Sequence, residues 1–385
     1  MCIRDSIEIA ERIRRVVRPD DIVGRLHGDE FLVVCRRTSK IRKANEIARR
    51  LVEAVARPLE TQPGLIVSGS VGIALNGRDA TEPLNADQLL VDADVAMYEA
   101  KRLGGSRSVN FTTDLGKRAV DRLRLHGEMQ RAAELDELEV HYQPIVDSQS
   151  TKTIGYEALA RIRSPKGEVR HLSAFLHGMA SSPLLWDLDR RAVRHTLDAL
   201  KEIREVLGTS DLFVSSNVSG ISLSQPDVVT TMLDMADERG LSSRDIVIEI
   251  DGESALEAGT AGLSALERLI EVGARVILDG FGTNTSTLAH LEALPLSGIK
   301  LNRSLVPELD DAQTQALIVK ATQRASDRGQ LLFASGVETQ TQLDQLREYG
   351  FEGVQGWLFA GAIPLQDNLL IAQAEQSQGE QSNAG

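Results

Sequence analysis

The sequence lacks the features that would place it in a disulfide-rich, zinc-binding or membrane-spanning class. Its 385 residues include two cysteines, Cys2 and Cys35, with no CxxC or Cys/His spacing, so neither a zinc centre nor a disulfide framework is indicated. No apolar run approaches the roughly 18 residues that a membrane-crossing helix needs. Residues 1–6 lack the apolar core of a signal peptide. We therefore expect a soluble, cytoplasmic protein.

Positive charge is also scarce in this chain. The 43 Lys and Arg residues stand against 56 Asp and Glu residues, which gives a formal net charge of −13 at pH 7. This balance argues against a broad surface for a nucleic-acid polymer. A small anionic ligand stays compatible with it, because bound metal ions and a few Arg or Lys side chains set the local charge. The hydrophobic share of 42% is ordinary for a globular protein.

What the sequence does contain is a series of polar residues, each near the end of a short apolar strand. Helix-length amphipathic stretches separate most of these strands. About eight such repeats over roughly 240 residues are typical of a (β/α)8 barrel, whose chemistry lies at the C-terminal ends of its strands. Carboxylates gathered there with an Asn and a Lys indicate a site for hard divalent cations and an anionic substrate. The residues are Gln143, Glu157, Asn217, Glu249, Asp279, Lys300, Glu338 and Gln355.

A smaller α/β domain precedes the barrel. Its patterns predict helices over 7–17, 43–56 and 86–102, a hairpin over 22–35, and a strand within 65–75. The domain prediction is a partial α/β domain over 1–112, a linker helix over 113–136, the barrel over 137–372 and a tail over 373–385. That tail is rich in Gln, Ser, Glu and Gly, and we expect it to be disordered because it has little to bury.

Residues 24–31 (Gly-Arg-Leu-His-Gly-Asp-Glu-Phe) resemble the GGDEF hairpin of diguanylate cyclases, and 90–104 resemble that family's C-terminal helix. The resemblance implies that Glu30 and Asp29 lie near a metal. His27 stands where the family has its first glycine, and a bulky side chain costs steric room there. The family's first strand has no counterpart before residue 7, and one hairpin cannot build a two-metal site. We expect no diguanylate cyclase activity and favour a structural hairpin.

An RxxD pair precedes the hairpin. Arg18 and Asp21 have the spacing of that family's product-inhibition site, which implies an allosteric site for cyclic di-GMP. Arg/Asp pairs are also common in turns, so a turn without ligand is the alternative.

Residues 157–161 (Glu-Ala-Leu-Ala-Arg), after 141–145 (His-Tyr-Gln-Pro-Ile), resemble the EAL family of cyclic di-GMP phosphodiesterases. The likeness covers essentially the whole predicted barrel, and the GGDEF-then-EAL order is a common tandem. It continues through 216–219, 249–250, 279–288, 299–301, 336–339 and 355–358.

The EAL resemblance implies a role for each residue at the predicted rim. Glu338 would complete the metal shell, and Lys300 would orient the attacking water and offset phosphoryl charge. Arg161 would donate to phosphate. The implied ligands of Mg2+ or Mn2+ are Glu157, Asn217, Glu249 and Asp279, and the implied substrate-binding residues are Gln143, Leu159, Arg161 and Gln355.

Three departures from the family pattern gather near one loop. Gly280 replaces the second Asp of the metal loop, and Gly252 stands where the family anchors that loop with Glu, with Glu253 one residue later. Asn302 replaces an Asp. Two-metal hydrolysis needs both ions held, so we expect one or two ions, with the second site weakened.

Three functions follow from these residues. The first is a barrel that binds cyclic di-GMP with impaired or residual hydrolysis, which Gly280 favours. The second is an active phosphodiesterase that opens the ring to linear pGpG. The third, a scaffold without ligand, is opposed by the retained Gln143 and Arg161. The resemblance further implies pairing of two barrels through the face near the metal loop, and an upstream sensor domain is compatible with it.

Overall fold

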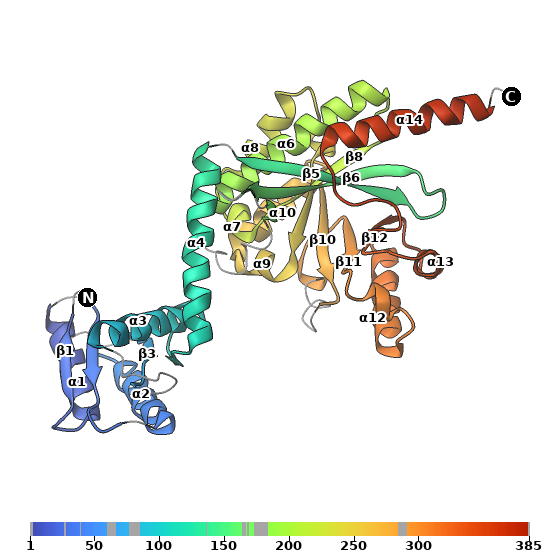
Figure 1. Cartoon of the computed structure of the whole chain (residues 1–385). Coiled ribbons are helices and arrows are strands. Elements are labelled where there is room, and N and C mark those ends of the chain that lie inside the picture. The colour runs from blue at the N-terminus through green and yellow to red at the C-terminus, as the bar shows by residue number, and fades with distance from the viewer. Residues whose placement is uncertain are drawn as a thin grey trace. The chain divides into compact units, whose positions relative to one another are not determined.

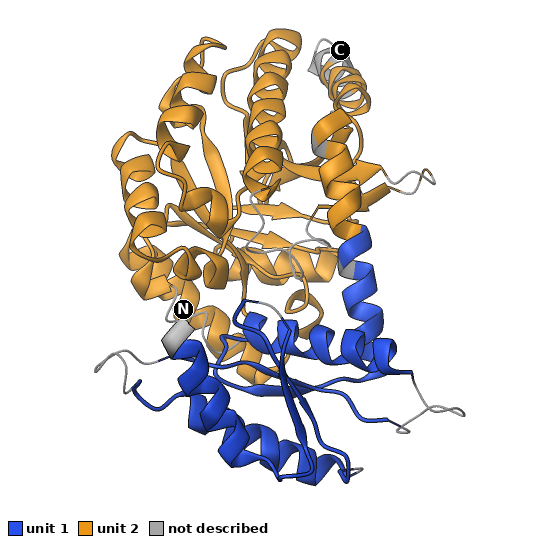
Figure 2. Cartoon of the chain, turned by 90° about the vertical axis from the view of Figure 1, so that its left-hand side faces the viewer, with its two compact units in different colours: residues 1–124 blue, residues 125–385 orange. Residues whose placement is uncertain are grey.

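The computed structural model describes residues 3–26, 28–38, 40–59, 67–76, 85–135, 137–163, 167, 169–172, 184–283 and 291–383. The chain divides into two compact units, residues 1–124 (unit 1) and 125–385 (unit 2), which Figure 2 colours separately. His27 and residues 284–290 of the predicted metal loop lie outside the described residues.

Unit 1 contains the predicted α/β elements within a few residues of their expected bounds. The hairpin is antiparallel, with Ile22 opposite Val34, and the other two strands pair in parallel. An apolar cluster that includes Ile9, Ile13 and Leu51 joins the first two helices. The elements are α1 (Ile3–Val16), β1 (Ile22–Arg25), β2 (Phe31–Val34), α2 (Ile41–Val55), β3 (Val71–Ile73), α3 (Ala86–Arg102) and β4 (Ser108–Asn110). The helix α4 (Thr113–Leu135) contains the predicted linker and spans the boundary between the units.

Eight strands of unit 2 close into a barrel (Figure 1). Around the barrel they run β5, β6, β8, β9, β10, β11, β12 and β13, and β13 pairs back to β5. A ninth strand, β7, extends the outer edge of β6. The bounds are β5 (Leu138–Asp147), β6 (Thr153–Arg163), β7 (Val169–His171), β8 (Phe213–Asn217), β9 (Val247–Asp251), β10 (Arg275–Phe281), β11 (Gly298–Leu301), β12 (Leu331–Ser335) and β13 (Gly353–Gln355). The predicted barrel fold is confirmed.

The first strand departs from the expected strand–helix repeat. β5 runs antiparallel to both of its neighbours, and a tight turn rather than a helix joins it to β6. Asp147 Oδ1 accepts hydrogen bonds from the N–H and the hydroxyl of Ser150 at 2.6 Å each, and two strands joined by such a turn form an antiparallel hairpin. Gln143 therefore lies in the middle of β5, and Glu157 lies in the middle of β6. The predictions that these two residues end strands are wrong.

Helices surround the barrel strands in Figure 1. Their buried faces and the outward faces of the strands make the largest apolar cluster of the chain, as expected for this architecture. The helices are α6 (Leu184–Leu207), α7 (Gly220–Leu223), α8 (Val228–Asp237), α9 (Gly252–Glu257), α10 (Gly259–Glu271), α12 (Ala312–Asp327), α13 (Gln340–Glu348) and α14 (Leu365–Asn383), with short 3-10 helices η1 (Ser243–Asp245) and η2 (Val306–Glu308).

The N-terminal end of the barrel is filled by two phenylalanines that face glycines. The rings of Phe213 and Phe333 lie edge to face with centroids 6.2 Å apart. A Cβ at Gly353 would meet the Phe333 ring at 2.4 Å, and a Cβ at Gly155 would meet the Phe213 ring at 2.7 Å. The missing side chains therefore make room for the rings, and the barrel is closed by a packed apolar layer rather than open as a pore.

The C-terminal residues differ from the sequence prediction. Where a disordered tail is expected from residue 373, α14 continues to Asn383. Gln, Glu and Ala have good helix propensity, so this segment extends a helix that Leu369 anchors to the barrel by burial.

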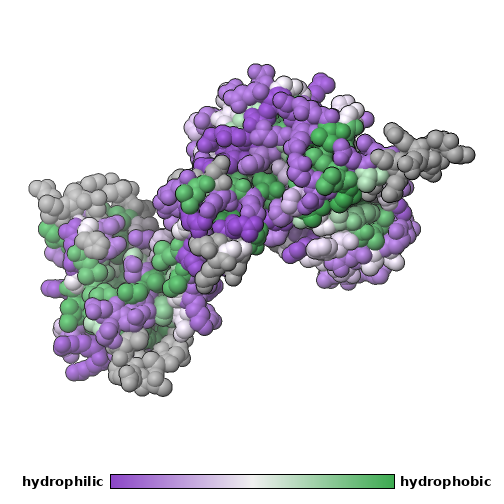
Figure 3. Space-filling model, turned by 45° about the horizontal axis from the view of Figure 1, so that its top comes forward, coloured by the Kyte–Doolittle hydropathy of each residue, from purple (hydrophilic) through white to green (hydrophobic). Residues whose placement is uncertain are grey.

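Hydrophilic residues cover much of the face of unit 2 shown in Figure 3, with hydrophobic residues in groups between them. Among the described residues, no helix is both long and apolar enough to cross a membrane.

Candidate functional site

A layer of polar side chains lies directly above the apolar layer that closes the barrel. Side chains of a strand alternate between its two faces, so residues two apart point to the same side. On each strand, the inward-facing position of the lower layer is apolar or glycine. The residue two positions closer to the mouth of the barrel, which is the end where the parallel strands have their C-termini, is polar. The pairs are Ile145 and Gln143, Gly155 and Glu157, Phe213 and Ser215, Val247 and Glu249, Ile277 and Asp279, Gly298 and Lys300, Phe333 and Ser335, and Gly353 and Gln355.

At the centre of this layer the Lys300 ammonium group bridges two glutamates. Lys300 Nζ donates to Glu157 Oε2 at 2.7 Å and to Glu249 Oε2 at 2.8 Å. The three residues are 2%, 5% and 1% exposed, respectively. Because charges buried this deeply are costly unless paired, the three side chains fix one another's positions.

Neutral donors complete the contacts of the glutamates. Glu157 accepts from Gln355 Nε2 at 2.6 Å and from Asn217 Nδ2 at 3.0 Å. Glu249 Oε1 accepts from the Ser215 hydroxyl at 2.6 Å. Gln143 in turn donates from Nε2 to the Ala360 carbonyl at 3.0 Å. The structure thus brings together predicted residues from β5, β6, β8, β9, β11 and β13.

The electrostatics of this cluster show an excess of negative charge. Burial favours a higher pKa for Glu157, but the Lys300 charge and its hydrogen bond hold that pKa below its usual value. Burial, followed by the charge of Glu157, raises the pKa of Glu249 to about 8. Burial also raises the pKa of Asp279, although Lys300 opposes the shift. One ammonium group therefore does not balance three carboxylates.

This donor set fits a hard divalent cation. In the described part of the chain, no group of three His, Cys, Asp or Glu side chains has the spacing of a metal site; the Lys300 ammonium instead lies between Glu157 and Glu249. Carboxylate and amide oxygens are nevertheless the ligands that Mg2+ and Mn2+ prefer. A bound cation would stabilise the charged forms of Glu249 and Asp279 and so oppose the burial that raises their pKa values.

Beyond Asp279 and Lys300, the next residues at the ends of β10 and β11 include the uncharged Gly280 and Asn302. Gly280 has φ +70°, and among the described residues the nearest neighbour of a Cβ there would be Asn302 Nδ2 at 3.6 Å. The β10–β11 register shifts between Leu278 and Phe281, so Gly280 lies in an irregular stretch of strand. Gly280 and Asn302, two positions where the EAL resemblance implies Asp, are thus neighbours in space.

Two further predicted residues are not part of the cluster. Glu338 follows β12 in an exposed loop, where its backbone N–H donates to Gln342 Oε1 at 2.8 Å. Gly252 is the buried first residue of α9, which Asp251 caps by accepting from Ser254 N at 2.9 Å, and Glu253 beside it is exposed. Neither of these contacts links Glu338 or Gly252 to Glu157 or Lys300.

The substrate-binding candidates Leu159 and Arg161 follow Glu157 on the same face of β6. Arg161 is 7% exposed, and its Nη1 donates to the Leu159 carbonyl at 2.6 Å. Burial lowers the pKa of Arg161, and the charges of Glu157 and Glu139 oppose that shift. The guanidinium group therefore lies along the same face as the carboxylate cluster.

In unit 1 the motif residues lie on the surface. Asp21 Oδ2 accepts from the backbone N–H of Arg18 at 3.0 Å, which ties the pair into a turn. Arg25 Nε donates to the Gly28 carbonyl at 2.9 Å, and Asp29 is exposed at the hairpin tip. The Arg18–Asp21 contact is compatible with a turn that binds no ligand, and the Arg25–Gly28 contact is compatible with a structural hairpin. Both were alternatives in the interpretation of the sequence.

Two residues that sequence reasoning missed support the cluster. Ser215 lies two residues before Asn217 on β8, so the period of two could have revealed it. Asp189 of α6 is 4% exposed; its Oδ2 accepts from Ser219 N at 2.8 Å, from the Ser219 hydroxyl at 2.6 Å and from the Ser222 hydroxyl at 2.7 Å. It fixes the loop that follows Asn217, and its only sequence signal is an acidic residue on a buried helix face.

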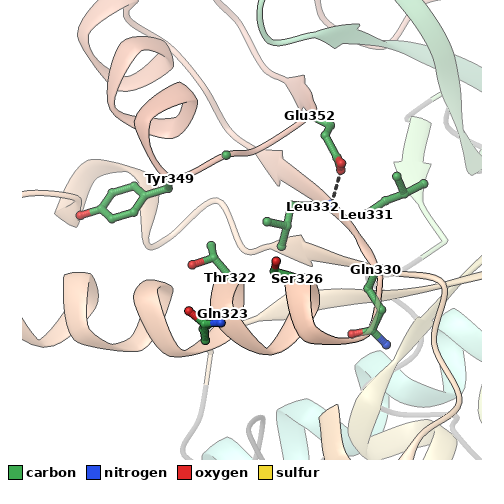
Figure 4. A pocket seen from close by; sticks show the side chains of 10 residues that line it. Thr322, Gln323, Ser326, Gln330, Leu331, Leu332, Tyr349 and Glu352 are labelled. Carbon is green, nitrogen blue, oxygen red and sulfur yellow. Dashed lines mark hydrogen bonds between the residues drawn. The ribbon is translucent and has the colours of Figure 1, made fainter.

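A separate hollow of about 510 Å³ lies at the opposite end of the barrel (Figure 4). It is lined by the end of α12, the start of β12 and the segment after α13. The Glu352 carboxylate accepts from Leu332 N at 2.8 Å, and Gln330 Nε2 donates to the Leu296 carbonyl at 2.9 Å. Active sites of this fold lie at the C-terminal ends of the strands. We therefore interpret the contacts of Glu352 and Gln330 as structural.

Comparison with known protein families agrees with the fold. The EAL domain family matches residues 126–362, and the diguanylate cyclase GGDEF domain family matches residues 7–107. The chain therefore belongs to the EAL domain family, with a GGDEF domain before the EAL domain.

Two curated relatives come from Pseudomonas aeruginosa. The cyclic di-GMP phosphodiesterase NbdA is 30% identical over 359 residues, which are 93% of this chain and 45% of NbdA. The bifunctional diguanylate cyclase/cyclic di-GMP phosphodiesterase MucR is 30% identical over 372 residues, covering 94% of this chain and 53% of MucR. The chain spans about half the length of these relatives.

Solved structures show the same architecture. The PaMucR phosphodiesterase in complex with c-di-GMP has a TM-score of 0.58 at 25% identity and covers 63% of this chain and 99% of that one. The EAL enzyme Bd1971 has a TM-score of 0.63 at 24% identity, covering 75% of this chain and 76% of its own.

Proposed function

We propose that the barrel mouth binds cyclic di-GMP and that its hydrolysis to pGpG is impaired. The observation that carries the proposal is an asymmetry of the mouth. The buried Glu157–Lys300–Glu249 cluster is connected by hydrogen bonds, whereas the ends of β10 and β11 have Gly280 beside Asn302, where a second ion needs acidic ligands.

The chain's own residues would supply most of the binding. Lys300 would place positive charge against the phosphoryl oxygens, Gln143 and Gln355 would donate to the ligand, and Arg161 would hold a phosphate. Glu157, Asn217, Glu249 and Asp279 would hold Mg2+ or Mn2+, and Glu338 would join them if its loop turned inward. A bound ion would lower the pKa of the attacking water and neutralise developing charge. Without a carboxylate at residue 280, a second ion is held weakly.

The alternative is an active phosphodiesterase. The intact Glu157–Lys300–Glu249 cluster and the phosphodiesterase relatives favour it. Incubation of the purified chain with cyclic di-GMP and Mn2+, followed by chromatography of the products, separates the two functions. Slow or absent pGpG formation with binding seen by calorimetry supports the proposal. Turnover at rates of about 1 per second or more, within the usual range for enzymes, overturns it.

The proposal extends to partners. We propose that two barrels pair through the face near the metal loop and that sensory input reaches the chain from an upstream domain. The relatives are about twice as long as the matched region, which leaves room for such a domain in them. Sedimentation with and without cyclic di-GMP tests the pairing: a monomer under both conditions excludes it.

A further inference from the structure

The chain that leaves β8 after Asn217 is held by three different elements of the barrel. Each of the next three residues donates its backbone N–H to a separate element, namely β9, α6 and α9. The bonds run from Val218 N to the Glu249 carbonyl at 2.9 Å, from Ser219 N to Asp189 Oδ2 at 2.8 Å, and from Gly220 N to Ser254 Oγ at 2.9 Å. The helix α7, which begins at Gly220, packs against α6 and α9 (Figure 1). Residues 218–220 therefore cannot shift without breaking a bond to at least one of these elements.

Asp189 holds this segment through a single carboxylate oxygen. Besides the backbone N–H of Ser219, its Oδ2 accepts from the hydroxyls of Ser219 and Ser222 at 2.6 Å and 2.7 Å. The arginine that follows Asp189 in sequence, Arg190, pairs with Asp187 instead. Among the described residues, every hydrogen bond that the Asp189 side chain accepts thus comes from the N-cap or the first turn of α7. Removal of this buried acceptor would leave its donors unpaired, which is costly.

Two of the proposed metal ligands depend on the same segment. Asn217 donates from Nδ2 to Glu157 Oε1 at 3.0 Å. An ionised carboxylate accepts but does not donate, so Oδ1 of Asn217 is the atom left to offer a cation. Glu249 is tied to the segment by its backbone carbonyl, which accepts from Val218 N. A shift of residues 218–220 would therefore move both Asn217 and Glu249.

We propose that Asp189 is a positioning residue for the divalent cation of the mouth, because it fixes the segment on which Asn217 and Glu249 depend. The inference rests on the proposed function, in which Asn217 and Glu249 hold Mg2+ or Mn2+. Asp189 acts through these residues and is not itself a ligand. Hydrogen-bond partners that orient the ligands of a metal commonly lower its affinity about 10- to 100-fold when they are removed.

The helix α6 offers a matched control for the alternative, in which Asp189 only stabilises the fold. Thr196 lies on the same helix and is 3% exposed, and its hydroxyl donates to the Ala192 carbonyl at 2.8 Å. Because that bond stays within α6, Thr196→Ala should lower stability without moving Asn217. Asp189→Asn is the conservative variant, since its amide oxygen can accept the same hydrogen bonds.

The test is titration of the whole chain with Mn2+, in the absence and in the presence of cyclic di-GMP, with free Mn2+ measured by electron paramagnetic resonance. Urea unfolding of the same proteins in EDTA measures their stability. We expect Asp189→Ala to bind Mn2+ about 10- to 100-fold more weakly than wild type, and Asp189→Asn to recover most of that loss. Thr196→Ala should bind as wild type does although it is less stable. Ser254→Ala, which removes the acceptor of Gly220 N, should also weaken Mn2+ binding.

Equal Mn2+ affinity in wild type and Asp189→Ala overturns the positioning role and leaves the proposed function intact. An equal loss of affinity in Thr196→Ala and Asp189→Ala does the same, because the loss then follows stability. If Asp189→Ala does not fold, Ser254→Ala decides, and wild-type affinity in that variant overturns the role.

The wild type separates this inference from the proposed function. Binding of cyclic di-GMP without any binding of Mn2+ overturns the positioning role alone, because no ion is then held. Binding of neither Mn2+ nor cyclic di-GMP overturns the proposed function and the positioning role together.

Discussion

In unit 1, the hairpin that carries the GGDEF-like motif has two short strands, and Arg25 and Asp29 are exposed to solvent. In unit 2, the motif residues Glu249 and Lys300 are 1% and 2% exposed and belong to a continuous hydrogen-bonded cluster. Both units contain residues typical of cyclic di-GMP signalling families. Only in unit 2 do they converge, because a closed barrel directs side chains from separate strands to one axis.

The contrast shows how burial couples function to stability. An exposed charged side chain at a hairpin tip is solvated with or without its neighbours. Its substitution therefore changes the free energy of unfolding little. A buried charge depends on each of its partners, so a substitution in the barrel cluster affects both the fold and the site. The four predictions below test this difference, from the largest expected effect to the smallest.

The substitution Lys300→Met should destabilise the barrel most. It removes the ammonium group that pairs with Glu157 and Glu249 and leaves two buried carboxylates together, which should cost about 3–5 kcal/mol and abolish hydrolysis. Urea unfolding measures the loss. Arg49→Met is the matched control in unit 1, because its pair with Glu53 is exposed and should be worth less than about 1 kcal/mol. Equal losses would contradict the comparison.

The substitution Gly280→Asp should raise hydrolysis about 100-fold or more, as restoring one electrostatic stabiliser of about 3–4 kcal/mol would. Within the part of the chain that the structure describes, the Cβ meets nothing closer than Asn302 Nδ2 at 3.6 Å, and Asp tolerates the left-handed φ of +70° better than most residues. Gly280→Ala is the control, because it has the same backbone strain without a carboxylate. The readout is pGpG formation with Mn2+; an equal rate in both variants would disprove the account of this loop.

Acidification should weaken unit 2 through His141 and His171. Burial and then the charge of Arg161 hold their folded-state pKa values below the ordinary 6.5, so as the pH falls below 6.5 the unfolded chain takes up protons first and stability decreases. Above 6.5 this contribution is constant. Because both side chains are largely solvated, the loss should stay below about 1 kcal/mol. Urea midpoints from pH 7.5 to 5.5 should fall less in H141Q/H171Q than in wild type or in H126Q, a matched control on α4; parallel curves would refute the assignment.

The smallest effect is expected for Arg18→Ala. The contact of this residue with Asp21 uses the Arg18 backbone N–H, so the turn survives the loss of the side chain. Stability should change by less than about 0.5 kcal/mol, and calorimetry should show unchanged affinity for cyclic di-GMP. Asp21→Ala, which removes the acceptor, should cost about 1 kcal/mol. Weaker binding by Arg18→Ala would instead establish the allosteric site.

The sequence by itself determined the features that depend on neighbouring residues. Apolar periodicity predicted the helix over 86–102 with the bounds that the structure has, and it predicted the antiparallel hairpin of unit 1. The alternation of apolar and polar positions along each strand determined that Glu249, Asp279 and Lys300 would face the same way, because side-chain direction on a strand follows from the backbone pleat.

The tertiary structure alone decided which of these residues meet. Closure of the barrel brings Glu157 to Lys300 across 143 positions of the chain, and it leaves Glu338, which follows β12, exposed. It also decided the burial of Asp189. Such contacts join residues distant in sequence, so they depend on how all the strands pack together and no local pattern specifies them.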